Sequence, residues 1–216
     1  HGKEDYAKVQ KDLEQELSRL QKLYADNEPE KSVKKKKTSA KALKRKARQV
    51  KLEKVLHLEK PGGPLPKNLD PSAKPLTVGA WCTPESGDGV LVAQGGESTG
   101  YSLYLAGGKA RFAVRSGGEL KEAVSGLKIE AGKRTHIAGT LAATGKLTVL
   151  VNGKAVGQAP GHLLPSRPFD GLNVGDDAES LVADYTTPTK LKGSLEDIRI
   201  YWGVLSAKEI KAWASK

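Results

Sequence analysis

The sequence of 216 residues has a single cysteine, Cys82, and no methionine. One cysteine excludes an internal disulfide and any metal site built from several cysteines. No apolar stretch approaches the roughly 20 residues that a membrane-spanning helix needs, so we expect no membrane partner. The chain starts at His1 without a visible signal peptide, and we expect it to be a piece of a longer protein.

Acidic residues are missing from one long segment. Residues 31–48 contain ten basic residues and no acidic one, and they supply most of the net charge of +11. From residue 61 onward, 18 basic residues face 15 acidic ones, which leaves a surplus of only +3. No aromatic residue is placed among the lysines to stack on bases, so we favour a solvated, self-repelling linker. Binding of nucleic acid or another polyanion through the lysines is the alternative.

Composition divides the chain into three segments. Residues 1–27 contain an amphipathic helix, expected at about 3–25, and residues 28–50 form the basic linker. We expect no stable structure at about 28–38, and a second helical pattern begins near Ser39. Residues 51–216 contain 23 of the 24 glycines. The apolar face of the first helix would consist of Tyr6, Val9, Leu13, Leu17, Leu20 and Tyr24.

The third segment consists of short runs in which apolar residues alternate, each followed by turn residues. Many short strands without helices between them predict a mainly β fold, namely a two-sheet antiparallel jelly-roll sandwich. Asn152-Gly153 predicts a hairpin with a type I′ turn. Ser206 and Glu209 have capping-box spacing and predict a short C-terminal helix at 207–214. The predicted strands are 54–60, 76–82, 89–96, 101–108, 110–116, 135–142, 146–153 and 195–203.

The motifs of this segment resemble, in their order, those of laminin-G-like, concanavalin A-like jelly-roll domains of bacterial secreted proteins. The resemblance covers about 52–214 and rests on "LTVGAWCTPESGDGVLVAQGG", "YSLYLAGGKARFAV", "THIAGTLAATGKLTVLVNGK" and "GSLEDIRIYWGVLSAKEI". It implies that Cys82 is a core residue, although Cys82 and Pro84 match part of the Cys-x-Pro-x-Arg motif of type-I sulfatases. Ser86 stands where that motif has arginine. The resemblance also makes His136 a structural, hydrogen-bonded histidine.

Two further stretches resemble bacterial type-I sulfatases. "YAKVQKDLEQELSRLQKLYADNEPE" is similar to the helix that ends their C-terminal subdomain, and "FDGLNVGDDAESLVADYTTPTKLKGSLEDIRI" is similar to the tail of planctomycete-type arylsulfatases. This resemblance implies that the chain is the C-terminal part of an exported sulfatase, periplasmic or extracellular. Residues 1–27 would end the preceding subdomain, and the catalytic domain would lie before His1.

The chain itself has no motif that predicts catalysis. Glu196 and Asp197 are the best carboxylate pair, but neighbouring residues of a strand point to opposite faces. The sequence has no Ser-His-Asp arrangement typical of a catalytic triad, no glycine-rich phosphate-binding loop and no His-x-x-x-His metal-binding pair. We therefore expect a non-catalytic accessory module that binds or positions polysaccharide, including sulfated polysaccharide, or packs on the catalytic domain. A purely structural or protein-interaction domain is the alternative.

The candidate binding residues are aromatic side chains, which stack on sugar rings, and arginines, which pair with sulfate groups. They are Trp81, Tyr104, Arg111, Arg115 and Tyr185. Calcium is a candidate cofactor, since laminin-G-like relatives often hold one at the rim of the sandwich and calcium prefers several oxygen ligands. The candidate ligands are Asp176, Asp177 and Asp184.

Overall fold

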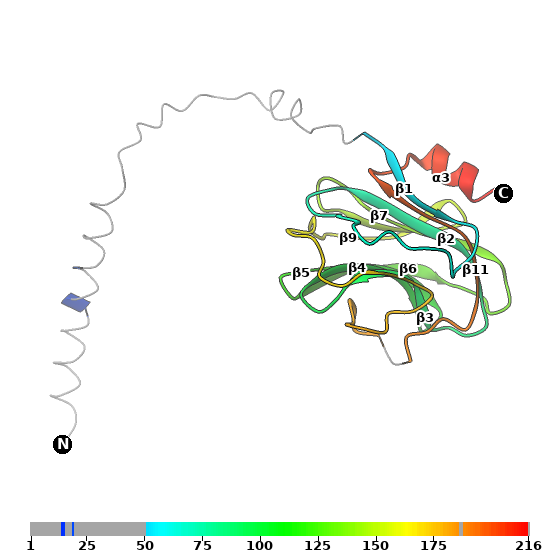
Figure 1. Ribbon diagram of the computed structural model, residues 1–216, viewed down its shortest axis with the longest axis horizontal. Coiled ribbons are helices and arrows are strands. Elements are labelled where there is room, and N and C mark those ends of the chain that lie inside the picture. The colour runs from blue at the N-terminus through cyan, green and yellow to red at the C-terminus, as the bar shows by residue number, and fades with distance from the viewer. Residues whose placement is uncertain (1–13, 16–18, 20–50, 186–187, 216) are drawn as a thin grey trace, which may run out of the picture. The chain divides into compact units, whose positions relative to one another are not determined.

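The computed structural model describes residues 14–15, 19, 51–185 and 188–215 (Figure 1). The chain divides into two units, residues 1–46 and 47–216, and the fold described below belongs to the second. The linker expected at 28–38 and the helical pattern near Ser39 lie outside the described residues. Of the helix expected at 3–25, only Glu14, Gln15 and Arg19 are described, and they are helical and exposed.

Two antiparallel sheets pack face to face, which confirms the predicted jelly-roll sandwich (Figure 1). One sheet has the strand order β1-β11-β2-β7-β8-β9, and the other has the order β10-β3-β4-β5-β6. The strands are β1 (Glu53–Leu58), β2 (Leu76–Pro84), β3 (Gly89–Gly95), β4 (Thr99–Ala106), β5 (Lys109–Ser116), β6 (Glu119–Lys128), β7 (Thr135–Leu141), β8 (Leu147–Val151), β9 (Lys154–Ala159), β10 (Leu172–Val174) and β11 (Gly193–Trp202). A single α-helix, α3 (Ala207–Trp213), follows the last strand in the described residues.

The core lies between the two sheets and is built from alternate residues of each strand. In β2, Val78, Ala80 and Cys82 point into it, and all three are fully buried. Cys82 is a free thiol, and burial raises its pKa to about 12. The prediction that Cys82 is a core residue is therefore confirmed.

Three strands were not predicted: β6, β9 and β10. Each of them lies at an edge of its sheet. An edge strand packs against one neighbour only, so it needs less apolar surface and its sequence alternates weakly. In β9, "KAVGQA", no residue is fully buried.

The predicted hairpin turn at Asn152-Gly153 and the predicted helix at 207–214 are both confirmed. Asn152 and Gly153 have φ values of 49° and 75°, as a type I′ hairpin turn requires. At the start of α3, the Ser206 amide donates to Glu209 Oε2 at 2.7 Å, and the Glu209 amide donates to Ser206 Oγ at 3.3 Å. No helix in the described ranges is long and apolar enough to cross a membrane.

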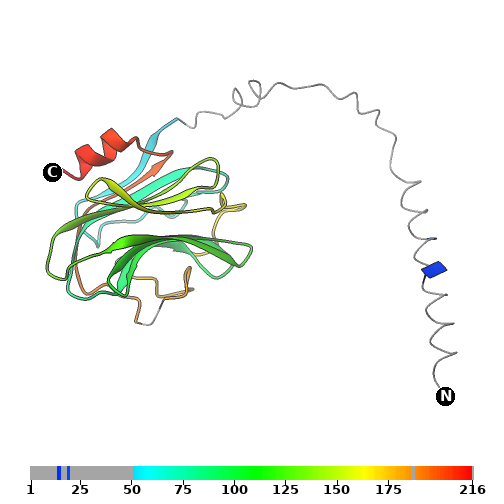
Figure 2. The same ribbon diagram turned by 180° about the vertical axis from the view of Figure 1, so that it is seen from behind.

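Both outer faces of the sandwich are partly covered. The helix α3 packs Ile210 and Trp213 on the outer face of the six-stranded sheet. On the opposite side, Val182 and Ala183 pack on the outer face of the five-stranded sheet, where Tyr104 is buried. Figure 2 shows this second covering layer beneath the five-stranded sheet, away from α3.

Candidate functional site

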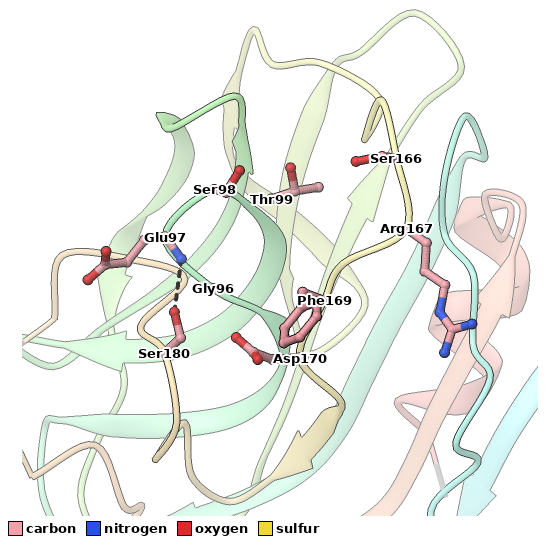
Figure 3. Close-up of a pocket in the computed structure, with 9 residues that line it drawn as sticks. All are labelled: Gly96, Glu97, Ser98, Thr99, Ser166, Arg167, Phe169, Asp170 and Ser180. Atoms are coloured by element: carbon pink, nitrogen blue, oxygen red, sulfur yellow. Dashed lines mark hydrogen bonds between the residues drawn. The ribbon is translucent and has the colours of Figure 1, made fainter.

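A polar pocket of about 400 Å³ lies beside the turn that joins β3 to β4 (Figure 3). Its wall is completed by residues 166–170, from the loop before β10, and by Ser180, from the loop after β10. Three separate parts of the chain therefore meet there. The lining residues are Gly96, Glu97, Ser98, Thr99, Ser166, Arg167, Phe169, Asp170 and Ser180.

Glycine at position 96 lets these parts approach closely. A Cβ atom on Gly96 would lie 2.1 Å from Ser180 Oγ and 2.8 Å from Asp170 Oδ2, so no other residue fits without displacement. The turn is held by the Gly96 amide, which donates to the Thr99 carbonyl at 3.2 Å. The Glu97 amide donates to Ser180 Oγ, also at 3.2 Å. The wall is thus fixed by one hydrogen bond within the backbone of the turn and one to the Ser180 hydroxyl.

Phe169 stands on this wall with a fully exposed side chain, at 102% relative exposure. Its neighbour Pro168 is buried, and Pro168 Cβ lies 2.8 Å from the position a Cβ on Gly95 would take. Aromatic rings usually bury 150–250 Å² of surface, so a ring left in water is a costly arrangement. The buried proline holds the loop while the ring faces solvent, which is the geometry of a stacking platform.

The polar groups around the ring are mostly acceptors and hydroxyls. Figure 3 shows the Arg167 side chain directed away from the other pocket residues. Arg167 Nη2 donates to the Lys67 carbonyl at 3.0 Å and to Asn68 Oδ1 at 3.3 Å. It therefore anchors the loop. Asp170 supplies a carboxylate to the pocket, whereas Figure 3 shows the Glu97 carboxylate directed away from the other pocket residues. A ligand that offers hydroxyl donors and an apolar face would complement Asp170 and the Phe169 ring.

None of the five binding residues predicted from sequence lines this pocket, although four of them lie together elsewhere. Tyr104 and Arg111 neighbour each other on β4 and β5 and share Glu122. The Tyr104 hydroxyl donates to Glu122 Oε2 at 2.5 Å, and Arg111 Nη1 donates to Glu122 Oε1 at 2.9 Å. The ring of Tyr185 meets that of Tyr104 edge to face, with centroids 4.9 Å apart. These groups are engaged with one another.

Arg115 is engaged in the same layer. Its Nε donates to the Val182 carbonyl at 2.6 Å, and its two terminal nitrogens donate to the Gly118 carbonyl at 2.9 Å and to Asp184 at 2.6 Å. The arginine thereby holds the covering loop on the five-stranded sheet. Four predicted binding residues are thus brought together at a contact within the chain.

The three candidate calcium ligands do not gather around one point. Asp176 accepts a short hydrogen bond from Thr189 Oγ1, and Asp184 pairs with Arg115. Asp177 is fully buried; its Oδ2 accepts from the Val182 amide at 3.0 Å. Burial, with the nearby acidic charges, raises the pKa of Asp177 to about 6.

Trp81 lies on the outer face of the other sheet, next to His136. The rings of these two residues have centroids 5.4 Å apart, and the Arg134 guanidinium lies 3.8 Å from the Trp81 centroid. His136 is buried, but neither ring nitrogen has a hydrogen-bond partner among the described residues. The expectation of a hydrogen-bonded histidine was therefore wrong: aromatic rings, including Trp213 at 4.6 Å, surround it instead. Burial lowers its pKa to about 4.

The expectation that Glu196 and Asp197 point to opposite faces was also wrong. A β-bulge interrupts the pairing of β11 with β2 between Glu196 and Arg199, and Asp197 has a φ of 49°. The extra residue breaks the two-residue alternation, so both carboxylates line one pocket of about 450 Å³. Glu196 pairs with Arg134 at 3.1 Å, and Asp197 pairs with Arg199 at 2.6 Å. Burial alone would raise the pKa of Asp197. The hydrogen bonds and charges of Arg199 and His57 outweigh this effect and hold the pKa below its usual value.

A family model described as the concanavalin A-like lectin/glucanases superfamily matches residues 61–211, which is more than half of the chain. The chain belongs to this superfamily. No curated protein matches the chain.

Solved structures share this superfamily's fold at low sequence identity. A native heptameric SAP-like pentraxin from Limulus polyphemus is 16% identical, with a TM-score of 0.52 over 76% of this chain and 81% of that one. The Ruminococcus gnavus IT-sialidase CBM40 bound to α2,3-sialyllactose is 14% identical, with a TM-score of 0.58 over 74% and 99%. Domain 4 of AbnA, a GH43 extracellular arabinanase from Geobacillus stearothermophilus, in complex with arabinotriose, is 19% identical, with a TM-score of 0.52 over 73% and 80%. At these identities the likeness concerns the fold.

Sequence reasoning missed the pocket of this superfamily domain. One signal was available: Phe169 is one of only two phenylalanines and lies between Pro168 and Asp170 outside every predicted strand. A loop aromatic next to proline is a candidate surface ring. The pairing of Gly96 with Ser180 had no such signal, because the two residues are distant in sequence and only the fold brings them together.

Proposed function

We propose that this superfamily domain is a non-catalytic carbohydrate-binding module, and that the pocket around Phe169 is its sugar site. The observation that carries the proposal is the fully exposed Phe169 ring on the wall of a polar pocket. The C–H face of a pyranose stacks on an aromatic ring, and sugar hydroxyls donate hydrogen bonds to carboxylates. The two similar carbohydrate complexes, with sialyllactose and with arabinotriose, support it.

The charges at the pocket favour neutral sugars. Two acidic residues, Glu97 and Asp170, line the pocket, whereas the guanidinium of Arg167 is engaged with Lys67 and Asn68. A sulfate group placed there would meet negative charge without a paired cation. We therefore propose that the module holds unsulfated stretches of a polysaccharide, even if the whole polymer carries sulfate elsewhere.

Replacement of Phe169 tests the site. The Phe169→Ala variant should lose glycan binding on an array of neutral polysaccharides, by about tenfold or more, which corresponds to ~1.4 kcal/mol of stacking. The matched control is Leu127→Ala, which removes another exposed apolar side chain, at 56% exposure, outside the pocket. Equal binding by the two variants, or failure of the wild-type chain to bind any glycan, would refute the proposal.

We further propose that the module belongs to an exported sulfatase, in which residues 1–27 end the preceding subdomain and residues 28–50 form a linker. The support is the order of the sulfatase-like stretches in the sequence, one before and one within the jelly roll. The test is the coding sequence upstream of His1. A Cys-or-Ser-x-Pro-x-Arg motif a few hundred residues earlier is expected, and a different upstream domain would end this assignment while leaving the sugar site untouched.

A further inference from the structure

A second group of side chains on the six-stranded sheet has the composition of a metal site. His57 lies on β1, Asp197 at the bulge of β11, and Glu59 just after β1. His57 Nε2 lies 2.9 Å from Asp197 Oδ1 and 3.1 Å from Glu59 Oε1. These three residues form the one group in the described ranges whose His, Asp or Glu ligand atoms all lie within 4.8 Å of one another. The group is separate from the Phe169 pocket.

The arrangement around His57 Nε2 brings one imidazole nitrogen and two carboxylate oxygens together, which are ligand atoms that a divalent metal ion accepts. A ring nitrogen carries one proton and can direct it well at one acceptor, yet two carboxylate oxygens lie within 3.1 Å of it. An octahedral ion with bonds of about 2.1 Å has ligand edges of about 3.0 Å, whereas a tetrahedral ion has edges of about 3.4 Å. The observed separations of 2.9 Å and 3.1 Å are ordinary hydrogen-bond distances, and an octahedral ion could replace the proton without moving the ligand atoms far apart.

Asp197 is held in place by Arg199 and Trp213, and the Arg199 Nε donates to Oδ1, the oxygen that also faces His57. Its carboxylate accepts two hydrogen bonds of 2.6 Å from Arg199 and one of 3.0 Å from Trp213 Nε1. Such outer contacts orient the ligands of metal sites and limit their motion. His57 is paired with Arg199 in the register of β1 and β11, so it too is positioned by the sheet.

The three residues share their pocket with Lys60, Arg134 and Arg199, and Glu196 adds a third carboxylate to balance these three cations. The three residues line a pocket of about 450 Å³, which is large enough for several water ligands. Glu59 is 81% exposed at its side chain and can adjust its bond to an ion that enters from solvent. Calcium prefers oxygen ligands only, so the imidazole nitrogen selects against it.

We propose that His57, Glu59 and Asp197 bind a six-coordinate divalent transition-metal ion. The ion connects the edge strand β1 to β11, and it stabilises that edge of the sheet by an amount that grows with the logarithm of ion concentration once that concentration exceeds the Kd.

Titration of the full chain with Ni²⁺, Co²⁺, Mn²⁺, Zn²⁺ and Ca²⁺ tests the proposal, with calorimetry and tryptophan fluorescence as readouts. Trp81 lines the pocket and Trp213 contacts Asp197, so Ni²⁺ and Co²⁺ should quench fluorescence as they bind one site. His57→Ala should weaken binding at least tenfold. Glu59→Gln, which keeps the size of an exposed side chain, should weaken metal binding several-fold.

The matched control is His162→Gln, which removes an exposed histidine whose Nε2 lies 3.7 Å from Glu119. This variant should bind the transition-metal ions as the wild type does. The proposal is overturned if the wild type binds none of them up to about 1 mM, if His57→Ala binds as tightly as the wild type, or if calcium binds at least as tightly as they do.

Discussion

At the residue scale, two buried titratable groups act on stability in opposite directions between pH 4 and 6. Burial lowers the pKa of His136 from 6.5 to about 4, so the unfolded chain binds more protons there and stability rises with pH. Burial raises the pKa of Asp177 from 3.8 to about 6, so the folded chain binds more protons and stability falls with pH. Each effect amounts to at most about 3 kcal/mol, and in the wild type they largely cancel.

Single replacements should separate the two effects. Asp177→Asn removes the contribution to stability that decreases as pH rises. The free energy of unfolding should therefore increase from pH 4 to 6.5 more steeply than in the wild type. His136→Leu removes the contribution to stability that increases with pH. The free energy of unfolding of this variant should therefore increase less than in the wild type, or decrease, over the same pH range. Urea unfolding at several pH values measures both slopes. Curves that run parallel for the three proteins would show that neither group titrates as its burial implies.

The residue scale also shows what the sequence could and could not predict. The burial of Cys82 followed from its parity with Val78 and Ala80, because alternation alone decides which face a strand residue occupies. The common pocket of Glu196 and Asp197 could not be predicted, since the bulge that breaks the alternation depends on the neighbouring strand.

At the element scale, the helix α3 packs closely on its sheet because Gly79 on β2 has no side chain to obstruct Trp213. A Cβ on Gly79 would lie 2.9 Å from Trp213 Cη2, from Ala138 Cβ and from the Ile137 carbonyl oxygen. Such a contact is shorter than atoms tolerate, so the helix or the strand would have to move. The prediction of a helix at 207–214 followed from its capping box, but its docking surface did not, because it depends on β2 and β7.

Gly79→Ala should therefore lower the free energy of unfolding by about 1–3 kcal/mol through overpacking and change the fluorescence of Trp213. The matched control is Gly126→Ala on β6, where the nearest atom to the added Cβ is the Val156 carbonyl oxygen at 3.6 Å. Thermal unfolding of both variants measures the difference. Equal melting temperatures would mean that α3 does not pack tightly on the sheet.

At the scale of the whole molecule, the core cluster that the described residues form lies between the two sheets of the second unit. The cluster between the sheets runs from Leu56 on β1 to Trp202 at the end of β11, and its members all lie in the described second unit. The two-sheet fold was predictable because many strands carried the same signal, so that a missed edge strand changed little. The pocket around Phe169 and the group of His57, Glu59 and Asp197 could not be predicted, because each joins side chains that only the folded sheets bring together.

Removal of the first 50 residues should consequently leave the jelly roll as stable as in the full chain. A variant that starts at Lys51 retains every member of the core cluster and should melt within about 2 °C of the full chain, which corresponds to less than ~1 kcal/mol. A variant that starts at Lys60 is the control, because it also lacks β1 and with it Leu56, His57 and Glu59. It should lose about 2–5 kcal/mol, as expected for a buried leucine and the pairing of an edge strand, and its response to transition-metal ions should disappear.

If the variant starting at Lys51 is destabilised as much as the one starting at Lys60, residues 1–50 are part of the folded domain and the linker assignment is wrong. If only the shorter variant loses stability, the domain begins at β1, and residues 1–50 are free to serve the catalytic part that we propose precedes them.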